Sequence, residues 1–257
     1  MGILNITPDS FSDGGKWNLK ESALYRVQEM ISEGAEVIDI GGESTRPGYE
    51  KISDDQEILR ILPIISAIKS RFDVPISVDT YKSAVAEAAL NEGADMVNDI
   101  WGFRHSENMA ELVKRYDAAC CLMHNRNEAV YSNFKNDVIS DLKESISIAK
   151  AAGISDDKII LDPGVGFAKT QEQNLFLIDN LSVFEELGYP LLLGASRKSV
   201  IGNVLDVPSD ERLEGTIVTT VRAARQGCLF VRVHDIKENM RAIKMTCALM
   251  ESRKYYG

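Results

Sequence analysis

Residues 75–99 read PISVDTYKSAVAEAALNEGADMVND, and this stretch carries the pattern that repeats along the chain. It begins with a short β-rich run, Pro75–Val78, and ends with a second one, Met96–Asn98. The segment between them, which starts after Thr80, has a helical pattern. Two strands joined by a helix are the unit of a parallel sheet, because parallel strands need a long crossover connection.

The same alternation continues in both directions along the chain. Other strands are expected at Gly2–Ile6, Glu36–Ile40, Ala118–Met123, Ile159–Leu161, Leu191–Gly194 and Leu229–Val233. Most are continuously apolar, as is typical of parallel strands that are buried on both faces. Eight such units in 257 residues, with no linker between them, favour a single (β/α)8 TIM barrel over residues 1–257. An open, doubly wound sheet is the lesser alternative.

The composition excludes several classes of protein. The net charge is −10 and no segment is dominated by Lys or Arg, so the surface repels nucleic acid. No apolar run approaches the roughly 20 residues that a membrane span needs, and the N-terminus lacks a secretory signal. We therefore expect a cytoplasmic protein with no nucleic-acid or membrane partner.

The four cysteines form no CxxC pair, which argues against a zinc site. Cys120 and Cys121 are adjacent in an expected strand. Because neighbouring residues of a strand point to opposite faces, we expect these two to be reduced core residues on opposite sides of the sheet.

Polar residues follow nearly every expected strand at its carboxyl end, where the active sites of barrels lie. They are Asn5, Glu43 to Arg46, Asp79, Asn98, Asp99, His124, Asp162, Ser196 to Ser199 and Arg232 to His234. Two long loops, Thr7–Asn18 and Gly41–Ser53, leave the same ends of the strands, and long loops in compact domains are usually functional. This concentration of polar groups predicts a binding site at the rim.

Single members of the set have structural alternatives. Asp79 could cap the helix that follows it, and Asp162 could stabilise the turn after its strand. Lys198 could be a solvated surface charge, as most lysines are. We expect Asp99 to be structural and Asp235 to cap the last helix.

The chemistry that the set would suit is binding of a flat, phosphorylated molecule. Asp79, Asn98 and Asp162 offer carboxylate and amide groups to a heterocycle with NH and NH2 donors beside a carbonyl. Positive charge comes from the last two loops, at Lys198, Arg232 and His234. A short helix expected after Ser199 has a positive N-terminal end, where these considerations place a phosphate.

Several motifs together resemble the dihydropteroate synthases over essentially the whole chain. The two long ones are Asn5-Ile6-Thr7-Pro8-Asp9-Ser10-Phe11-Ser12-Asp13-Gly14-Gly15 and Gly41-Gly42-Glu43-Ser44-Thr45-Arg46-Pro47-Gly48. Shorter ones follow in the family's order: Ser77-Val78-Asp79-Thr80, Asn98-Asp99-Ile100, Asp162-Pro163-Gly164, Ser196-Arg197-Lys198-Ser199 and Arg232-Val233-His234-Asp235. The resemblance implies a (β/α)8 homodimer that uses Mg²⁺. The implied substrates are (7,8-dihydropterin-6-yl)methyl diphosphate and 4-aminobenzoate, and the products are dihydropteroate and pyrophosphate.

The resemblance also implies residue roles. It assigns Asn5 to Mg²⁺ and pyrophosphate. The residues implied for the pterin diphosphate are Thr45, Asp79, Asn98, Asp162, Lys198, Arg232, Val233 and His234. Those for 4-aminobenzoate, where sulfonamides bind in the family, are Phe11, Arg46, Pro47 and Ser199. The implied catalytic residues are Asp13, Arg46 and Lys198. The family thus places a carboxylate, rather than a phosphate, at the Ser199 helix end, and either anion suits a positive dipole.

One segment departs from the family. After the fifth strand many members carry Met-His-Met-x-Gly-x-Pro, whereas this chain has Met123-His124-Asn125-Arg126-Asn127-Glu128. We transfer no role to Asn125 or Arg126, and we expect His124 to be structural.

Two other readings remain open. A methyltetrahydrofolate-dependent methyltransferase shares the barrel and a pterin pocket, but it has no need of Arg232 and His234 for a diphosphate. A non-catalytic pterin-binding paralogue would not need the intact first two loops.

The first strand starts at Met1 or Gly2, whereas members of the family usually carry a segment before it. An unsupported first strand should fray. We therefore expect either that the natural chain starts upstream or that another element, such as the C-terminal tail Arg253–Gly257, closes the barrel floor.

Overall fold

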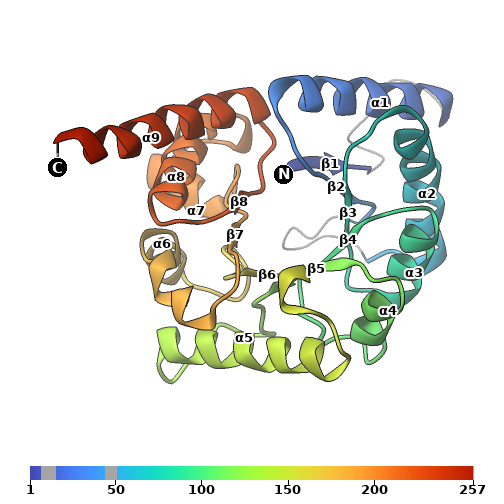
Figure 1. The fold of residues 1–257 in the computed structure, drawn as a ribbon, viewed down its shortest axis with the longest axis horizontal. Helices are drawn as coiled ribbons and strands as arrows, with labels where there is room; N and C mark the ends of the chain where they lie inside the picture. Colours follow the sequence, from blue (N-terminus) through green and yellow to red (C-terminus); the bar gives the residue numbers. More distant parts are fainter. Residues whose placement is uncertain (7–15, 44–50, 257) are drawn as a thin grey trace.

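A computed structural model describes residues 1–6, 16–43 and 51–256, and these form eight parallel strands inside a ring of helices (Figure 1). The strands are β1 (Gly2–Asn5), β2 (Ile38–Gly41), β3 (Ile76–Asp79), β4 (Met96–Asp99), β5 (Ala119–Met123), β6 (Ile159–Asp162), β7 (Leu192–Leu193) and β8 (Phe230–Val231). All eight lie where the β-rich runs predicted them.

The helices alternate with the strands. They are α1 (Lys16–Glu33), α2 (Asp54–Arg71), α3 (Ser83–Asn91), α4 (Met109–Arg115), α5 (Phe134–Ala151), α6 (Gln171–Asp179), α7 (Ser199–Leu205), α8 (Leu213–Arg225) and α9 (Ile236–Tyr256). Short 3-10 turns precede β6 at Asp156–Lys158, follow α6 at Leu181–Leu187 and precede α8 at Ser209–Glu211. The short helix expected after Ser199 is α7, which lies between β7 and the longer α8, so that prediction is confirmed. Among the described helices, none is long and apolar enough to cross a membrane.

The barrel closes through two narrow seams. Strands β1 to β6 form one parallel ladder, and β7 pairs with β8 in a second. An isolated bridge between Leu161 and Leu191 joins β6 to β7, and a second between Gly2 and Val233 joins β8 to β1. The Ile3 N–H donates to the Val233 carbonyl at 3.1 Å across this last seam. The ladder strands β7 and β8 are shorter than expected because their flanking residues form only bridges.

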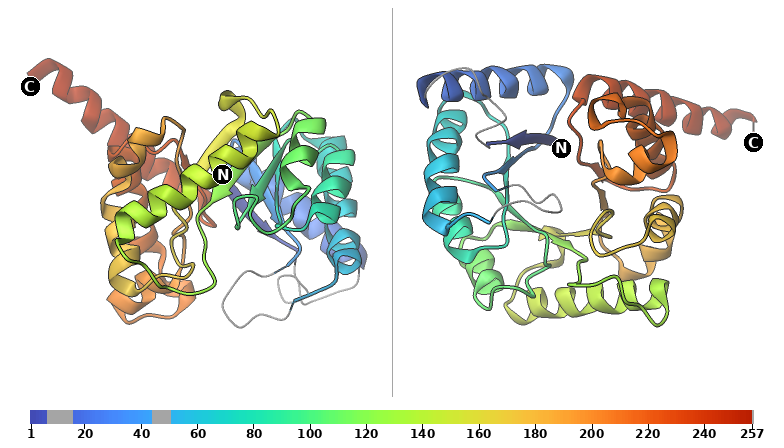
Figure 2. Two further views of the ribbon diagram at one scale, coloured as in Figure 1. Left: turned by 90° about the horizontal axis from the view of Figure 1, so that it is seen from below. Right: turned by 180° about the vertical axis from the view of Figure 1, so that it is seen from behind.

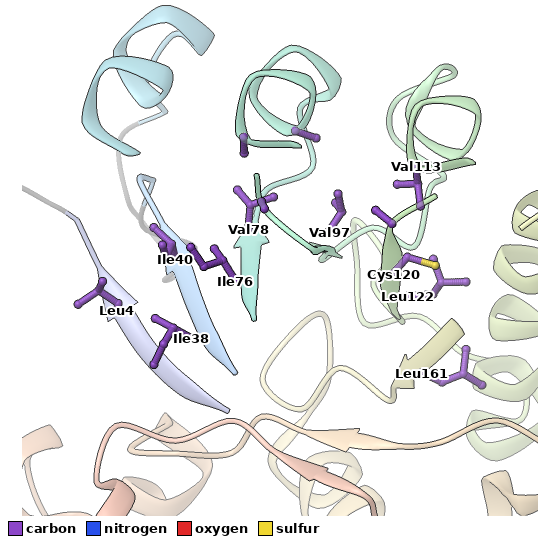
Figure 3. Packing of buried hydrophobic residues seen from close by; sticks show 14 of the residues in the cluster. Leu4, Ile38, Ile40, Ile76, Val78, Val97, Val113, Cys120, Leu122 and Leu161 are labelled. Atoms are coloured by element: carbon purple, nitrogen blue, oxygen red, sulfur yellow. The ribbon is translucent and has the colours of Figure 1, made fainter. Parts of the chain in front are cut away.

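The side chains of each strand divide into two layers, because successive residues point to opposite faces. Apolar residues such as Ile38, Ile40 and Ile76 belong to the large core between the strands and the helices. Figure 3 shows part of this core on the strands beneath the surrounding helices. The alternate positions face the barrel interior, where Asp39 and Asp79 are buried. The interior is therefore polar near its carboxyl end.

The lower part of the interior is apolar. Met96, Cys121, Ile160 and Leu192 form a separate buried cluster, against which Met1 and Phe230 pack. Cys120 belongs instead to the outer core, so the prediction that the two adjacent cysteines face opposite ways is confirmed. All four cysteines are free thiols.

The first strand is held on both sides, by β2 and by the Val233 bridge. Helix α9 continues in line past the rest of the fold and does not turn across the barrel floor (Figure 2). The expectation that the C-terminal tail covers the floor is therefore wrong, and the apolar cluster described above fills this end.

Candidate functional site

The predicted acidic and amide residues converge at the carboxyl end of the barrel. Asp79 and Asn98 are partners in the β3–β4 register, and Asp162 ends β6. All three side chains are buried. The sequence prediction that these side chains share one rim is confirmed.

Arg232, just after β8, lies at the centre of the site. Its Nε–H donates to Asp39 Oδ2 at 2.5 Å and its Nη2–H to Asp79 Oδ2 at 2.7 Å. Asn98 Nδ2 also donates to Asp39 Oδ2, at 3.3 Å. The two carboxylates raise the already high pKa of Arg232 despite its burial. Arg232 is therefore a paired cation inside the barrel mouth and not a solvated surface charge.

Asp39 is the residue that sequence reasoning missed. It lies between Ile38 and Ile40 in β2 and is completely buried. A signal was present, because an acidic residue in an otherwise apolar buried strand requires a partner. The identity of that partner was not readable from neighbouring residues.

Asp79 does not cap the helix after it. Helix α3 starts after Lys82 without a side-chain cap, and the Asp79 carboxylate faces Arg232. Burial raises the pKa of Asp79 to about 7, and the nearby Asp39 adds to the rise, although Arg232 opposes it. The Asp79 carboxyl group thus holds a proton more tightly than an exposed aspartate does.

Asp162 makes the expected turn contact and also faces the mouth, so its ligand-binding role stays a prediction. Its Oδ1 accepts from the Gly164 N–H at 2.7 Å, which is the expected turn bond. Its Oδ2 lies 3.5 Å from the point where a Gly194 Cβ would stand, and Lys198 Nζ lies 3.9 Å from that point. Burial raises the pKa of Asp162, while the positive Lys198 lowers it.

Lys198 reaches from loop 7, the segment after β7, into the same space. Its ammonium donates to the Val165 carbonyl at 2.5 Å and lies 4.7 Å from the centre of the Phe167 ring. Burial lowers the pKa of Lys198 to about 8, and Asp162 counteracts this effect. A lysine with these contacts is not a solvated surface charge.

Two glycines leave room between these groups. A Cβ at Gly41 would stand 3.7 Å from Asp79 Cβ and 3.8 Å from Asn5 Oδ1. Gly194 holds the equivalent position beside Asp162 and Lys198. Both residues occupy barrel positions where a side chain would project among the polar groups. Their lack of a Cβ gives a flat ligand close access to the strands.

Three buried oxygen atoms in this region have no hydrogen-bond partner among the described residues. They are Asp39 Oδ1, Ser77 Oγ and Asp79 Oδ1. Buried polar atoms are rarely left unpaired in proteins, and ordered water commonly satisfies the deeper ones. The Asp79 oxygen, at the end of its strand, is positioned to accept from a ligand donor.

The remaining predicted residues lie in loop 7 and in loop 8, the segment after β8, and their surroundings differ. The Ser196 hydroxyl lies 3.0 Å from His234 Nδ1 and accepts from the His234 N–H. Ser199 is exposed as the first residue of α7. Val233 is buried in the outer core, and its backbone bonds Met1 and Ile3. Any contact of Val233 with a ligand is thus limited to its backbone.

Asp99 and Asp235 have structural contacts. Asp99 accepts from the Trp101 and Phe103 N–H groups, as expected of a structural residue. Asp235, expected to cap α9, accepts two bonds from the Arg197 guanidinium. This ion pair ties loop 7 to loop 8.

Asn5 is the residue that the resemblance assigns to Mg²⁺. Its Oδ1 lies beside Gly41 and Asp79 at the rim. Among the described residues, no group of three or more His, Cys, Asp or Glu side chains could hold a metal ion. An amide oxygen from the protein, completed by phosphate oxygens and water, fits the chemistry of Mg²⁺, which retains waters and rarely has an all-protein cage.

Five predicted residues lie outside the described part of the chain. They are Phe11, Asp13, Thr45, Arg46 and Pro47. Their roles stay predictions.

Loop 5, which follows β5 and differs in sequence from the family, is bonded to helix α5 outside the strands. Arg126 binds Asp141 through two nitrogen atoms and packs over Tyr131, with its guanidinium carbon 4.5 Å from the ring centre. His124 is fully buried, with Nε2 3.0 Å from Asp141 and Nδ1 2.9 Å from Lys169 Nζ. Both contacts agree with the structural role expected for His124.

A second ionic cluster, also missed from the sequence, lies beside the stems of the loop after β2. Lys82 Nζ donates to Glu43 at 2.7 Å, to Glu57 at 2.9 Å and to the Ile52 carbonyl at 2.8 Å. Glu43 also accepts from the Tyr81 hydroxyl and the Ile52 N–H. This Lys82 cluster joins both stems of the loop to α2 and α3.

A (β/α)8 barrel with polar side chains gathered at its carboxyl end is the architecture of a barrel enzyme. Comparison with known proteins agrees with this class. Residues 1–234 match the family described as pterin binding enzyme, and the chain belongs to that family. It is 58% identical over 247 residues to the dihydropteroate synthase of Clostridium beijerinckii, covering 96% of this chain and 92% of that protein.

Solved structures extend the similarity to three dimensions. One is a Clostridium difficile dihydropteroate synthase determined in the presence of pteroic acid, with a TM-score of 0.94 and 50% identity. It matches 96% of this chain and 95% of its own. Another is the Xanthomonas albilineans enzyme with 4-aminobenzoic acid, with a TM-score of 0.92, 37% identity and coverage of 97% and 92%.

Proposed function

We propose that this protein catalyses the dihydropteroate synthase reaction. It joins (7,8-dihydropterin-6-yl)methyl diphosphate to 4-aminobenzoate and releases pyrophosphate, as a transferase of folate synthesis. The observation that carries the proposal is the convergence of Asp79, Asn98 and Asp162 with two cations in the barrel mouth. Close similarity to dihydropteroate synthases over nearly the whole chain supports it.

The pterin ring fits the acidic side of the mouth. Its ring N–H and exocyclic amine are donors, and Asp79 and Asp162 are buried acceptors that would pair with them. Asn98 can both accept and donate. Lys198 would donate to the ring carbonyl, since its ammonium is directed into the space beside Asp162.

The diphosphate is the leaving group. Arg232 and His234 supply the cationic side of the site, and Thr45 is the further contact that the resemblance implies. Mg²⁺, when bound at Asn5, would neutralise charge that develops on the departing oxygen. Val233 would take part through its backbone alone.

The chemical step forms a C–N bond in place of a C–O bond and an N–H bond. The C–O bond to the diphosphate breaks and its electron pair leaves with pyrophosphate, while the electron-rich pterin stabilises the methylene carbon. The nitrogen of 4-aminobenzoate then bonds to that carbon and releases a proton. Because the arylamine is already neutral at pH 7, no strong general base is needed.

The second substrate would bind at the outer side of the mouth. Ser199 starts α7, whose positive end suits the aminobenzoate carboxylate. The proposal completes this subsite with Phe11, Arg46 and Pro47, and it includes Asp13 and Arg46 among the catalytic residues. A sulfonamide, which also carries an arylamine, would compete there.

The test is formation of dihydropteroate from both substrates and Mg²⁺, with and without a sulfonamide. We expect product, and inhibition that excess 4-aminobenzoate relieves. Pterin binding without product would identify a non-catalytic paralogue, and product formed from methyltetrahydrofolate would identify a methyltransferase. Asp162→Asn should weaken pterin binding by about 10- to 100-fold, because it replaces an acceptor with a donor.

We also propose that the protein is a homodimer that associates through helices α6, α7 and α8. A groove of about 640 Å³ lies between these helices. Its lining includes the exposed apolar side chains Leu175, Val204, Leu205 and Val218. Exposed apolar side chains that gather on one face mark an interaction surface, and a two-fold dimer would bury the same face of both copies.

Light scattering tests the dimer. Val218→Glu should yield a monomer, whereas Leu59→Glu, at an equally exposed apolar position on α2, should not change the mass. A monomeric wild-type protein, or identical masses for both variants, would contradict the proposal.

We further propose a cytoplasmic location, which the four free thiols support.

A further inference from the structure

Below the predicted pterin pocket lies a carboxylate that the proposed chemistry does not use. Asp39 is completely buried in the middle of β2, among strands whose other side chains at this level are mainly apolar. A buried charge is costly unless it is paired and hydrogen-bonded. Its place in the barrel therefore requires a compensating arrangement, which the structure shows.

That arrangement consists of two donors on the same oxygen. Asp39 Oδ2 accepts from Arg232 Nε at 2.5 Å and from Asn98 Nδ2 at 3.3 Å. Both donors belong to residues of the predicted pterin site. Asp39 itself, fully buried beneath them, has no exposed surface toward the opening.

The guanidinium of Arg232 makes two hydrogen bonds, each to a different carboxylate. Asp79 binds Nη2 and Asp39 binds Nε, so two carboxylates from neighbouring strands determine the plane of the guanidinium. A single bond to Asp79 would leave the guanidinium free to rotate about that contact. The second bond removes this freedom before a ligand arrives.

The orientation of the Asn98 amide is determined by its hydrogen bond to Asp39. Asp39 Oδ2 already accepts from Arg232 Nε, so the side of the amide that faces this oxygen is the NH2 group. The amide oxygen is consequently left for another donor. A donor such as a ring N–H would be favoured there, and an acceptor would be rejected.

We propose that Asp39 is the positioning residue of the pterin site, which holds the Arg232 guanidinium and the Asn98 amide in their binding orientations. This inference rests on the proposed function only in taking a pterin as the ligand. Asp39 acts through its two neighbours and does not touch the substrate.

The test compares Asp39→Asn with Ser77→Ala. Ser77 is the partner of Asp39 in the β2–β3 register, is equally buried, and its hydroxyl has no hydrogen-bond partner among the described residues. Asp39→Asn should weaken binding of the pterin diphosphate by about 10- to 100-fold, as for loss of a charged hydrogen bond. It should raise the KM for that substrate and leave the KM for 4-aminobenzoate within about threefold. Ser77→Ala should change neither by more than about threefold.

A double-mutant cycle with Arg232→Met separates positioning from general damage. Once Arg232 is absent, Asp39→Asn should cost less than a third of what it costs in the wild-type background. The double variant also removes two opposite charges together, so it offers a folded protein if Asp39→Asn alone does not fold. Additive losses, or equal losses from Ser77→Ala, would overturn the proposal.

Calorimetry with an unreactive pterin keeps this test independent of the reaction. If the wild-type protein binds the pterin but forms no dihydropteroate, the proposed reaction fails while the Asp39 comparison still holds. If Asp39→Asn binds the pterin as tightly as wild type does, the positioning role fails even though the enzyme is active.

Discussion

Burial shifts the pKa values of several ionisable residues of the mouth toward their neutral forms, although the pKa of Arg232 is raised by its carboxylate partners. Burial raises the pKa of Asp79 to about 7 and lowers the pKa of Lys198 to about 8. The neighbouring Lys169 is lowered to about 7 for the same reason. Small changes of pH near neutrality therefore change the charge of this site.

Lys198 predicts a specific pH dependence of pterin binding. Below a pKa of about 8 the side chain is an ammonium and can donate to the pterin carbonyl; above it, the charge is lost. Pterin affinity should therefore fall as the pH rises from about 7 to about 9, whereas Lys198→Arg, which stays charged, should show a flatter curve. Calorimetry at several pH values tests this, and parallel curves for the two proteins would refute it.

Asp79 predicts a pH dependence of stability. Its pKa in the folded chain is raised from 3.8 to about 7, so the folded state binds the proton more tightly than the unfolded state does. The stability from this proton is complete below the unfolded pKa and is lost as the pH rises through the folded pKa. The free energy of unfolding of Asp79→Asn should thus fall less than that of wild type between about pH 5 and about pH 8. Urea titrations measure both slopes, and equal slopes would contradict the assignment.

At the scale of elements, loop 6 after β6 is constrained most tightly at Gly164. Gly164 has φ of +74°, and a Cβ there would stand 1.9 Å from the His124 carbonyl oxygen. Gly188 has nearly the same φ, +76°, but a Cβ there would meet nothing within 4 Å. Alanine substitutions at these two glycines therefore distinguish the cost of backbone strain from the cost of a steric clash.

Gly164→Ala should therefore lower the free energy of unfolding by about 2–5 kcal/mol, since strain and a clash combine. Gly188→Ala, with strain alone, should lower it by about 1–2 kcal/mol. Denaturant unfolding of both variants measures the difference. Equal losses would show that the contact with His124 does not constrain the loop.

The Lys82 cluster makes a prediction for the elements around the loop after β2. Lys82→Met would leave Glu43 and Glu57 buried without their cation, which should cost about 3–5 kcal/mol of stability. Lys69→Met breaks an ion pair with Asp95 that is largely exposed, and should cost at most about 1 kcal/mol. Thermal and urea unfolding test the contrast, and similar losses would show that the cluster is not a structural clamp.

At the scale of the whole molecule, the barrel is held unevenly. Strands β1 to β6 share one continuous ladder, whereas β7 and β8 have two residues each and join the rest through isolated bridges. The predicted pterin site spans this weaker side, because Asp79 comes from β3 while Arg232 follows β8. Ligand binding should therefore stabilise the seam.

Hydrogen exchange tests this expectation. The amides of Ile3 and Val233, which bond across the seam, should exchange faster than those of Val97 and Cys121 in the continuous ladder. A bound pterin should slow exchange at the seam more than in the ladder. Uniform exchange with and without ligand would show that the barrel opens as a single unit.

Much of the fold was predictable because its signals are local. Short apolar runs separated by helical spacing identify buried parallel strands whatever lies beside them, and all eight were located in this way. Their carboxyl ends in turn located Asp79, Asn98 and Asp162. The bounds of β7 and β8 were less accurate, because pairing with a distant strand decides where a ladder stops.

What the sequence by itself determined is the barrel, the order of its strands and the rim that carries the polar groups. Only the tertiary structure decided which of these groups meet. Arg232 and Asp39 are 193 residues apart, and their bond exists because β8 returns beside β1 and closes the ring. The same closure buries Asp79 and Lys198, and burial is the main cause of their pKa shifts. Neither the pairing nor the burial is a property of neighbouring residues, so neither could be read along the chain.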